Sequence, residues 1–144
     1  MISLIAYAIA LLVATVAVHA VGTYFLLRGS LKQSRPSGHM WISLGAAIRI
    51  VFLLLIHLLE VSLWAVLYYH RDAFPDFLTS FHFSVFATFG YGDFVIKEQY
   101  RTLGGVEKVV GVMMISWSTA LLVGYLQAAY TPFLDRSKDS GRPA

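Results

Sequence analysis

Six consecutive residues near the middle of the chain have the types and spacing to bind a cation. Residues 88–93 read Thr-Phe-Gly-Tyr-Gly-Asp. Because glycine reaches backbone angles that other residues avoid, Gly90 and Gly92 let a strand-like chain turn successive carbonyl groups to one side. Four such strands around an axis would form stacked rings of oxygens that replace the water shell of a cation, and the Thr88 hydroxyl would extend the stack at its inner end.

A short apolar run that starts with Pro75 must position this motif. At 1.5 Å per residue, a helix of its length reaches only about 20–25 Å, which is too short to cross a bilayer. Pro75 suits a first helical position, and Asp72 or Asp76 brings negative charge to the positive end of the helix dipole. We therefore expect a re-entrant helix over residues 75–87, followed by the cation-binding segment at 88–93.

Three longer apolar stretches, residues 1–27, 41–69 and 105–130, have the roughly 20 residues that a membrane-crossing helix needs. The first lacks the basic start of a signal peptide, so we expect it to be retained. The chain is 58% apolar and 13% charged, and its mean hydropathy is +0.68. This balance argues against a soluble enzyme and against disorder. The predicted fold class is an all-α membrane protein with three transmembrane helices and a re-entrant segment between the second and third.

The charges between the spans indicate their orientation. The loop at 28–40 and the tail at 131–144 are net positive, whereas the segment between the second and third spans is net negative. Positive loops favour the cytoplasmic side, so we expect an external N-terminus and a cytoplasmic C-terminus, in the plasma (inner) membrane. The net charge of +3 is too small and too scattered to indicate nucleic-acid binding. The first span has no arginine ladder for voltage sensing, and the tail is too short for a ligand-binding domain.

The motif at 88–93 resembles the selectivity-filter signature of the potassium-channel pore family, whose loops read TVGYG. The order of the elements is also similar: an outer helix at 41–69, a pore helix at 75–87, the filter, and an inner helix at 105–130. The stretches 57–64 and 116–120 resemble small bacterial members that have a bare pore domain. The resemblance implies a pore domain at 41–130, with residues 1–27 as an extra peripheral helix.

The resemblance also implies the site residues. K⁺ would be bound by the filter, at Thr88, Phe89, Gly90, Tyr91 and Gly92, and the filter would be supported by Asp93, Glu60 and Trp64. One filter strand cannot surround an ion, so a homotetramer in the lipid bilayer is expected. The implied function is passive, K⁺-selective permeation, with no enzyme activity and no cofactor other than the permeant ion.

The filter departs from the family pattern in ways that leave two alternatives open. Phe89 stands where Val or Ile is usual, and Ala87 stands where Thr is usual. The larger ring of Phe89 must pack behind the filter, which favours a weakly selective cation channel as one alternative. The other alternative is a non-conducting membrane scaffold or partner subunit with a vestigial filter.

Several polar residues lie inside the spans, where charge is costly. We expect Glu60 to brace the filter or pore helix, by resemblance to acidic residues on the family's outer helices. His57 lies one turn before Glu60, and either this pair or His82 could sense pH, although a packed histidine is the simpler interpretation. His19 is expected to be a structural helix contact, and no histidine spacing indicates a metal site. Arg49 is expected to snorkel to the inner interface.

The inner helix carries small residues that could line a cavity or bend the helix. Ser116, Thr119 and Val123 recur at helical spacing and could face the cavity, whereas Gly111, Ser116 and Gly124 are candidate bending points. Ordinary packing of small residues between membrane helices is the alternative interpretation.

Overall fold

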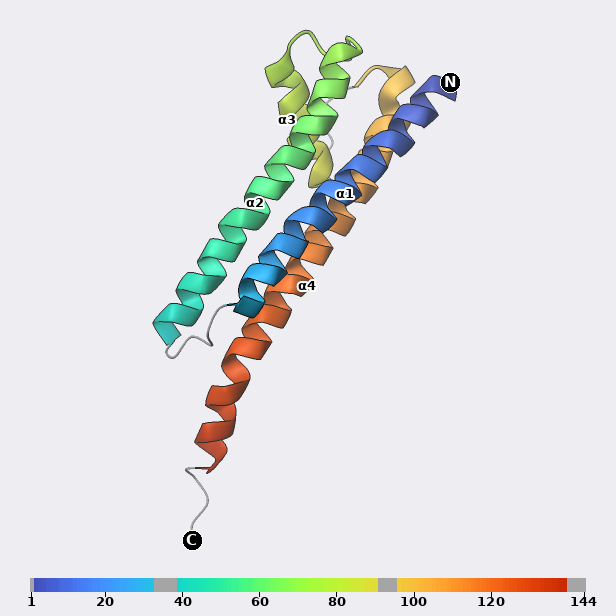
Figure 1. The fold of residues 1–144 in the computed structure, drawn as a ribbon. Helices are drawn as coiled ribbons and strands as arrows, with labels where there is room; N and C mark the ends of the chain where they lie inside the picture. The colour runs from blue at the N-terminus through green and yellow to red at the C-terminus, as the bar shows by residue number, and fades with distance from the viewer. Residues whose placement is uncertain (1, 33–38, 91–95, 140–144) are drawn as a thin grey trace.

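The chain forms a long bundle of helices (Figure 1). The computed structural model describes the backbone of residues 2–32, 39–90 and 96–139, and the side chains of 4–29, 39–90 and 96–131. These ranges contain no strand, and their elements are α1 (Ile2–Lys32), α2 (His39–His70), α3 (Phe77–Thr88), the 3₁₀-helix η1 (Glu98–Tyr100) and α4 (Arg101–Asp139). The predicted all-α fold class is confirmed.

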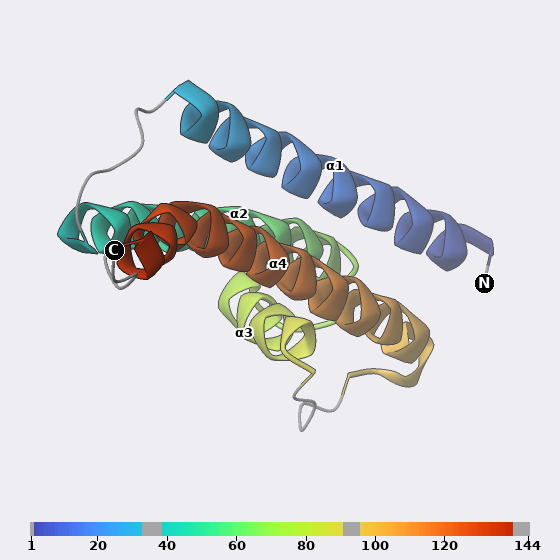
Figure 2. The ribbon, with the colours of Figure 1, turned by 90° about the horizontal axis from the view of Figure 1, so that it is seen from below.

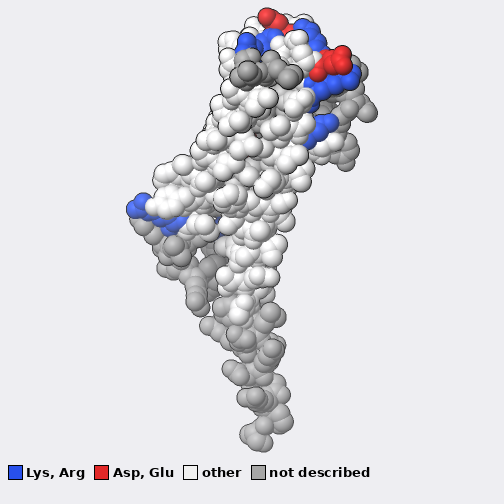
Figure 3. All heavy atoms as spheres, turned by 90° about the vertical axis from the view of Figure 1, so that its right-hand side faces the viewer, with Lys and Arg blue, Asp and Glu red and all other residues white. Residues whose placement is uncertain are grey.

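Within the described ranges, three segments are long and apolar enough to cross a membrane: Leu4–Gly29, His39–His70 and Glu98–Thr131. In Figure 3, uncharged side chains cover a broad zone of the visible face, and Lys, Arg, Asp and Glu gather beyond it. Large apolar residues of the three spanning helices, such as Val13, Leu54 and Val109, are more than half exposed. Since lipid rather than water suits such a surface, the chain is an integral membrane protein.

The short helix α3 and the first helix α1 lie on opposite sides of the α2–α4 pair (Figure 2). Both α1 and α3 contact α2 and α4. At the α3 end of the bundle, the buried hydrophobic core consists of Ala8, Trp64, Tyr68, Ala73, Phe83, Ala87, Ile96, Tyr100 and Leu103. Every helix contributes to this core, so α3 is held by packing from the two helices that flank it in sequence.

The start of α3 differs from the prediction. Pro75 does not occupy the first helical position, because Asp76 is the N-cap and the helix begins at Phe77. The Asp76 carboxylate accepts hydrogen bonds from the backbone N–H and the hydroxyl of Thr79, both at 2.8 Å. These bonds satisfy a free N–H of the first turn and lower the pKa of Asp76 below its usual value.

The inner helix is longer than the predicted 105–130. It begins at Arg101 and continues to Asp139, so the backbone is helical through much of the segment that we expected to be a tail. α2 likewise extends past both ends of the predicted 41–69. Helix α4 continues past the predicted end although Pro132 lies two residues beyond it, so this proline does not end the helix.

Candidate functional site

The end of α3 delivers the chain to the filter motif. Thr88, which was predicted to begin the filter after a helix ending at residue 87, is instead the last, buried residue of α3, and Phe89 is the C-cap. The N–H of Gly90 donates to the carbonyl of Ala87 at 2.9 Å, and Gly90 has a φ of +78°. Side-chain-bearing residues rarely adopt this angle, so the position requires glycine. Of the predicted filter residues, Tyr91, Gly92 and Asp93 lie outside the described part of the chain.

Phe89 is 56% exposed on the single chain. The packing of its ring behind the filter stays a prediction, because residues 91–95 lie outside the described part of the chain. The predicted filter oxygen at this position is the backbone carbonyl of residue 89, so it is present whatever the side chain is.

Helix α4 passes directly against Thr88, the first residue of the predicted filter. A Cβ atom on Gly111 would lie 2.7 Å from the carbonyl oxygen of Thr88 and 2.8 Å from its Cα. Such distances are shorter than any ordinary contact and involve backbone that cannot rotate away. Gly111, which was expected to be a bending point, therefore permits the close approach of α4 to Thr88.

The buried carboxyl group of Glu107 joins helices α2, α3 and α4. Glu107 of α4 is 1% exposed. It accepts a hydrogen bond from the Tyr68 hydroxyl of α2 at 2.8 Å and another from the Ser84 hydroxyl of α3. We call Glu107, Tyr68 and Ser84 the Glu107 cluster. Its geometry fixes α3 relative to both spanning helices, since all three side chains are buried and hydrogen-bonded.

Glu107 was not among the site residues expected from the sequence, yet it contacts α3 through Ser84. A signal was present in the spacing. Gly104, Glu107 and Gly111 follow one another at intervals of three and four, so they share one helix face. Added Cβ atoms on Gly104 and Gly111 would contact Phe83 and Thr88 of α3, which shows that this face is turned toward α3.

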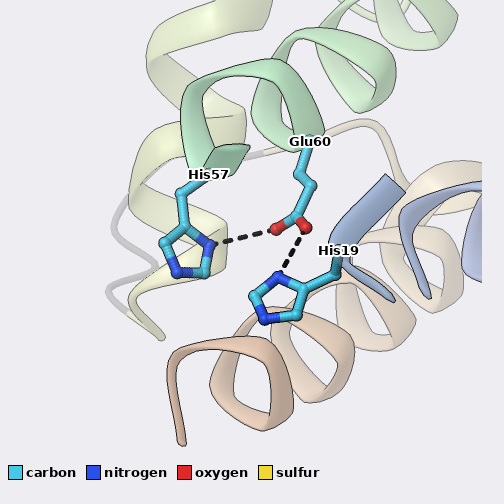
Figure 4. Close-up of side chains that lie close together, drawn as sticks. All are labelled: His19, His57 and Glu60. Atoms are coloured by element: carbon cyan, nitrogen blue, oxygen red, sulfur yellow. Dashed lines mark hydrogen bonds and ion pairs between the residues drawn. The ribbon is translucent and has the colours of Figure 1, made fainter. Parts of the chain in front are cut away.

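Glu60 makes its hydrogen bonds elsewhere (Figure 4). Its two carboxylate oxygens pair with Nδ1 of His19 at 2.8 Å and Nδ1 of His57 at 3.0 Å. On the far side of the rings, Ser118 Oγ lies 3.1 Å from Nε2 of His57 and 3.4 Å from Nε2 of His19. We call these four residues the Glu60 cluster.

The Glu60 cluster joins α1, α2 and α4, and among the described residues its hydrogen bonds do not reach α3. The expected hydrogen-bonded brace on the pore helix is therefore formed by Glu107 rather than by Glu60. The ligand atoms of His19, His57 and Glu60 lie within 4.8 Å of one another. Sequence spacing did not indicate this grouping, because His19 and Glu60 are 41 residues apart.

Trp64 and Arg49 are both buried between helices. The Trp64 indole N–H donates to the Thr15 hydroxyl of α1 at 3.0 Å, and its ring lies in the core with residues of α3. Arg49 does not snorkel to the interface as expected. It is 8% exposed, it donates to the Gly45 carbonyl at 2.9 Å, and its guanidinium lies 3.8 Å from the centre of the Tyr125 ring.

The other predicted site residues lie on the surface of the single chain. Exposed positions are occupied by His82, Ser116, Thr119, Val123 and Gly124. The hydroxyls of Ser116 and Thr119 donate to carbonyls one turn earlier in α4, at 2.8 and 2.9 Å. Their exposure leaves them available to face a cavity between subunits, and the assignment of cavity-lining and pH-sensing roles stays a prediction.

Comparison with known proteins adds one finding. A family model described as an ion channel matches residues 56–128, just over half of the chain. The match contains the C-terminal half of α2, all of α3 and most of α4. No curated protein and no solved structure matches the chain. With a re-entrant helix between two spanning helices inside the matched region, the chain belongs to this family of ion channels.

Proposed function

We propose that the chain is a subunit of a homotetrameric, K⁺-selective channel. The observation that carries this proposal is the junction at the end of α3, where Thr88, Phe89 and Gly90 lead into Tyr91, Gly92 and Asp93. Gly90 has the positive φ that this backbone needs. The junction lies within the ion-channel region, between two helices long enough to span a membrane.

The proposed mechanism is passive permeation through rings of backbone oxygens. Four copies of the segment would place carbonyls of Thr88, Phe89, Gly90 and Tyr91 around one axis. These oxygens would replace the hydration shell of K⁺ as it enters. The negative end of the α3 dipole, at its C-terminus, would favour a cation in the cavity below the filter.

The requirement for four copies follows from geometry. One filter strand presents oxygens on one side of an ion only, and closed rotational symmetry supplies the others. The single chain leaves large apolar residues exposed at the end of α3 and on α4, including Phe86, Phe89 and Met113 at 46%, 56% and 60%. Neighbouring subunits would cover this surface in the assembled channel.

Flux from proteoliposomes tests the proposal. We expect the purified protein to release K⁺, Ba²⁺ to block the release, and cross-linking to produce a ladder that ends at four chains. Gly90→Ala should abolish the flux because of the φ of +78°. The matched control is Gly105→Ala, where an added Cβ would meet nothing within 4 Å. A correctly inserted wild-type protein without flux would favour the non-conducting scaffold.

A weakly selective cation channel is the second candidate, and the specific observation behind it is the exposed Phe89 ring at the entry to the filter. Phe89→Val restores the residue type usual in the family that the motif resembles. If the ring weakens selectivity, this substitution raises the K⁺/Na⁺ permeability ratio. Equal ratios in both proteins would remove this candidate.

We also propose an external N-terminus and a cytoplasmic C-terminus in the plasma membrane, on the basis of the loop charges. The chain has no cysteine, so a cysteine added at either end is a unique label. Maleimide that cannot cross membranes should label the N-terminal cysteine in intact cells, and the C-terminal cysteine only after lysis.

A further inference from the structure

We propose that His19, His57 and Glu60 form a binding site for a transition-metal dication of the zinc class. Two imidazoles and one carboxylate form a ligand set that suits zinc, cobalt and nickel. Potassium and calcium prefer sites made wholly of oxygen atoms. The site is thus chemically distinct from the filter, and metal binding to it does not depend on the proposed K⁺ selectivity.

The positions of the ligand atoms fit such an ion. The two Nδ1 atoms approach the same carboxylate, at 2.8 Å for His19 and 3.0 Å for His57, and all three ligand atoms lie within 4.8 Å of one another. Around a tetrahedral zinc with bonds of about 2.1 Å, neighbouring ligand atoms are about 3.4 Å apart. Small rotations of the three side chains are sufficient to place an ion between them.

Ser118 provides the outer support that metal-bound histidines need. When Nδ1 of a histidine binds a metal, its Nε2 carries the proton and donates it to a neighbouring acceptor. The Ser118 hydroxyl lies 3.1 Å from Nε2 of His57 and 3.4 Å from Nε2 of His19. A hydroxyl oxygen has two lone pairs and can accept from both rings. A single serine on α4 therefore orients both imidazoles toward the same point.

Burial of the three side chains favours occupation of the site by a cation. The side chains of His19, Glu60 and His57 are 0%, 5% and 15% exposed, and the His19 ring lies 5.4 Å from that of Trp117. A carboxylate in such surroundings is poorly solvated, and a dication offsets its charge. His57 is the most exposed of the three.

The ligands come from two parts of the molecule. His57 and Glu60 belong to the region matched by the ion-channel family, whereas His19 lies outside it on α1. Metal binding would fasten α1 to α2, with the inner helix α4 attached through Ser118. Its effect on flux rests on the proposed channel function, but the binding itself does not.

Cobalt(II) is the probe, because its visible spectrum reports the ligands around it. The full chain, purified in detergent and treated with chelator, should bind one Co²⁺ per subunit with intense tetrahedral bands, and Zn²⁺ should displace it. His19→Gln and Glu60→Gln should abolish these bands, whereas His82→Gln, at an exposed position on α3, should retain them. Absence of the bands in the wild-type protein, or their persistence in His19→Gln, would overturn the proposal.

Two further variants distinguish loss of ligands from loss of folding. Ser118→Ala keeps all three ligands and should weaken metal affinity about 10–100-fold. His19→Cys adds a thiolate to a chain that has no cysteine. If residue 19 is a ligand, this variant gains a sulfur-to-cobalt charge-transfer band in the near ultraviolet. A folded His19→Cys protein that binds Co²⁺ without this band would contradict the assignment.

Discussion

Glu107 and Glu60 are both buried carboxyl groups within spanning helices, but their partners differ in kind. Glu107 is held by two hydroxyls, from Tyr68 and Ser84, whereas Glu60 is held by two imidazoles. Hydroxyl groups keep their protons over the physiological pH range, whereas imidazoles gain and lose protons and bind metals. We infer that the Glu107 cluster is a fixed joint, which holds α3 against α2 and α4. The groups that attach α1 can change their protonation or bind a metal ion.

The largest expected effect comes from Glu107→Ala. This change leaves the buried hydroxyls of Tyr68 and Ser84 without their acceptor and opens a cavity. The loss of unfolding free energy should be roughly 2–5 kcal/mol. Thermal unfolding of the detergent-purified protein measures it, and Glu107→Gln, which keeps an acceptor and the shape, should lose less. Equal melting of Glu107→Ala and wild type would contradict the fixed joint.

Gly111→Ala tests the other contact behind the filter. The added Cβ would lie 2.7 Å from the Thr88 carbonyl oxygen, so α4 or the filter backbone must move. We expect a cost of about 1–3 kcal/mol and a large loss of ion flux. Gly105→Ala, on the same helix in open space, is the control and should conduct normally. Normal flux through Gly111→Ala would show that the close contact is not required.

Glu60→Gln should act on α1 and spare α3. It replaces the charged acceptor shared by two imidazoles with a neutral amide, which weakens both hydrogen bonds by roughly 1–3 kcal/mol in total. Hydrogen–deuterium exchange should therefore become faster in α1 while exchange in α3 stays near the wild-type rate. The reverse pattern, with α3 loosened, would restore the expected brace of the filter by Glu60.

The smallest effect is expected at Asp76, which lies in neither cluster. Its lowered pKa means that the charged form is favoured in the folded state. The stabilisation is therefore complete above the carboxyl's ordinary pKa of 3.8 and is lost as the pH falls below it. Asp76→Ala should give a small drop in melting temperature at neutral pH and none in strong acid. A drop that is the same at both pH values would argue against the capping role.

The helices could be predicted from the sequence, whereas the pairing of buried polar groups could not. An apolar run of spanning length indicates a membrane helix by itself, and the glycine pattern marks the filter. In contrast, α1 is apolar on nearly every side, so its pattern does not say which face meets α2. The contact between His19 and Ser118, which are 99 residues apart, depends on the rotation of α1 and α4 about their own axes.

The same reasoning explains the exchange of roles between the two carboxyl groups. Both Glu60 and Glu107 are acidic residues in apolar segments, and resemblance to a family favoured Glu60 for the brace. Glu107 shares a helix face with Gly104 and Gly111, which approach α3, whereas Glu60 on α2 faces His19 of α1. Only the three-dimensional arrangement reveals these directions.

The most direct test of the central claim is a reversal potential measured in a planar bilayer, with K⁺ on one side and Na⁺ on the other. A filter built from the backbone after α3 should give a current that reverses far from zero, in the direction set by K⁺. A reversal potential near zero, or the absence of any current from correctly inserted tetramers, would contradict the claim.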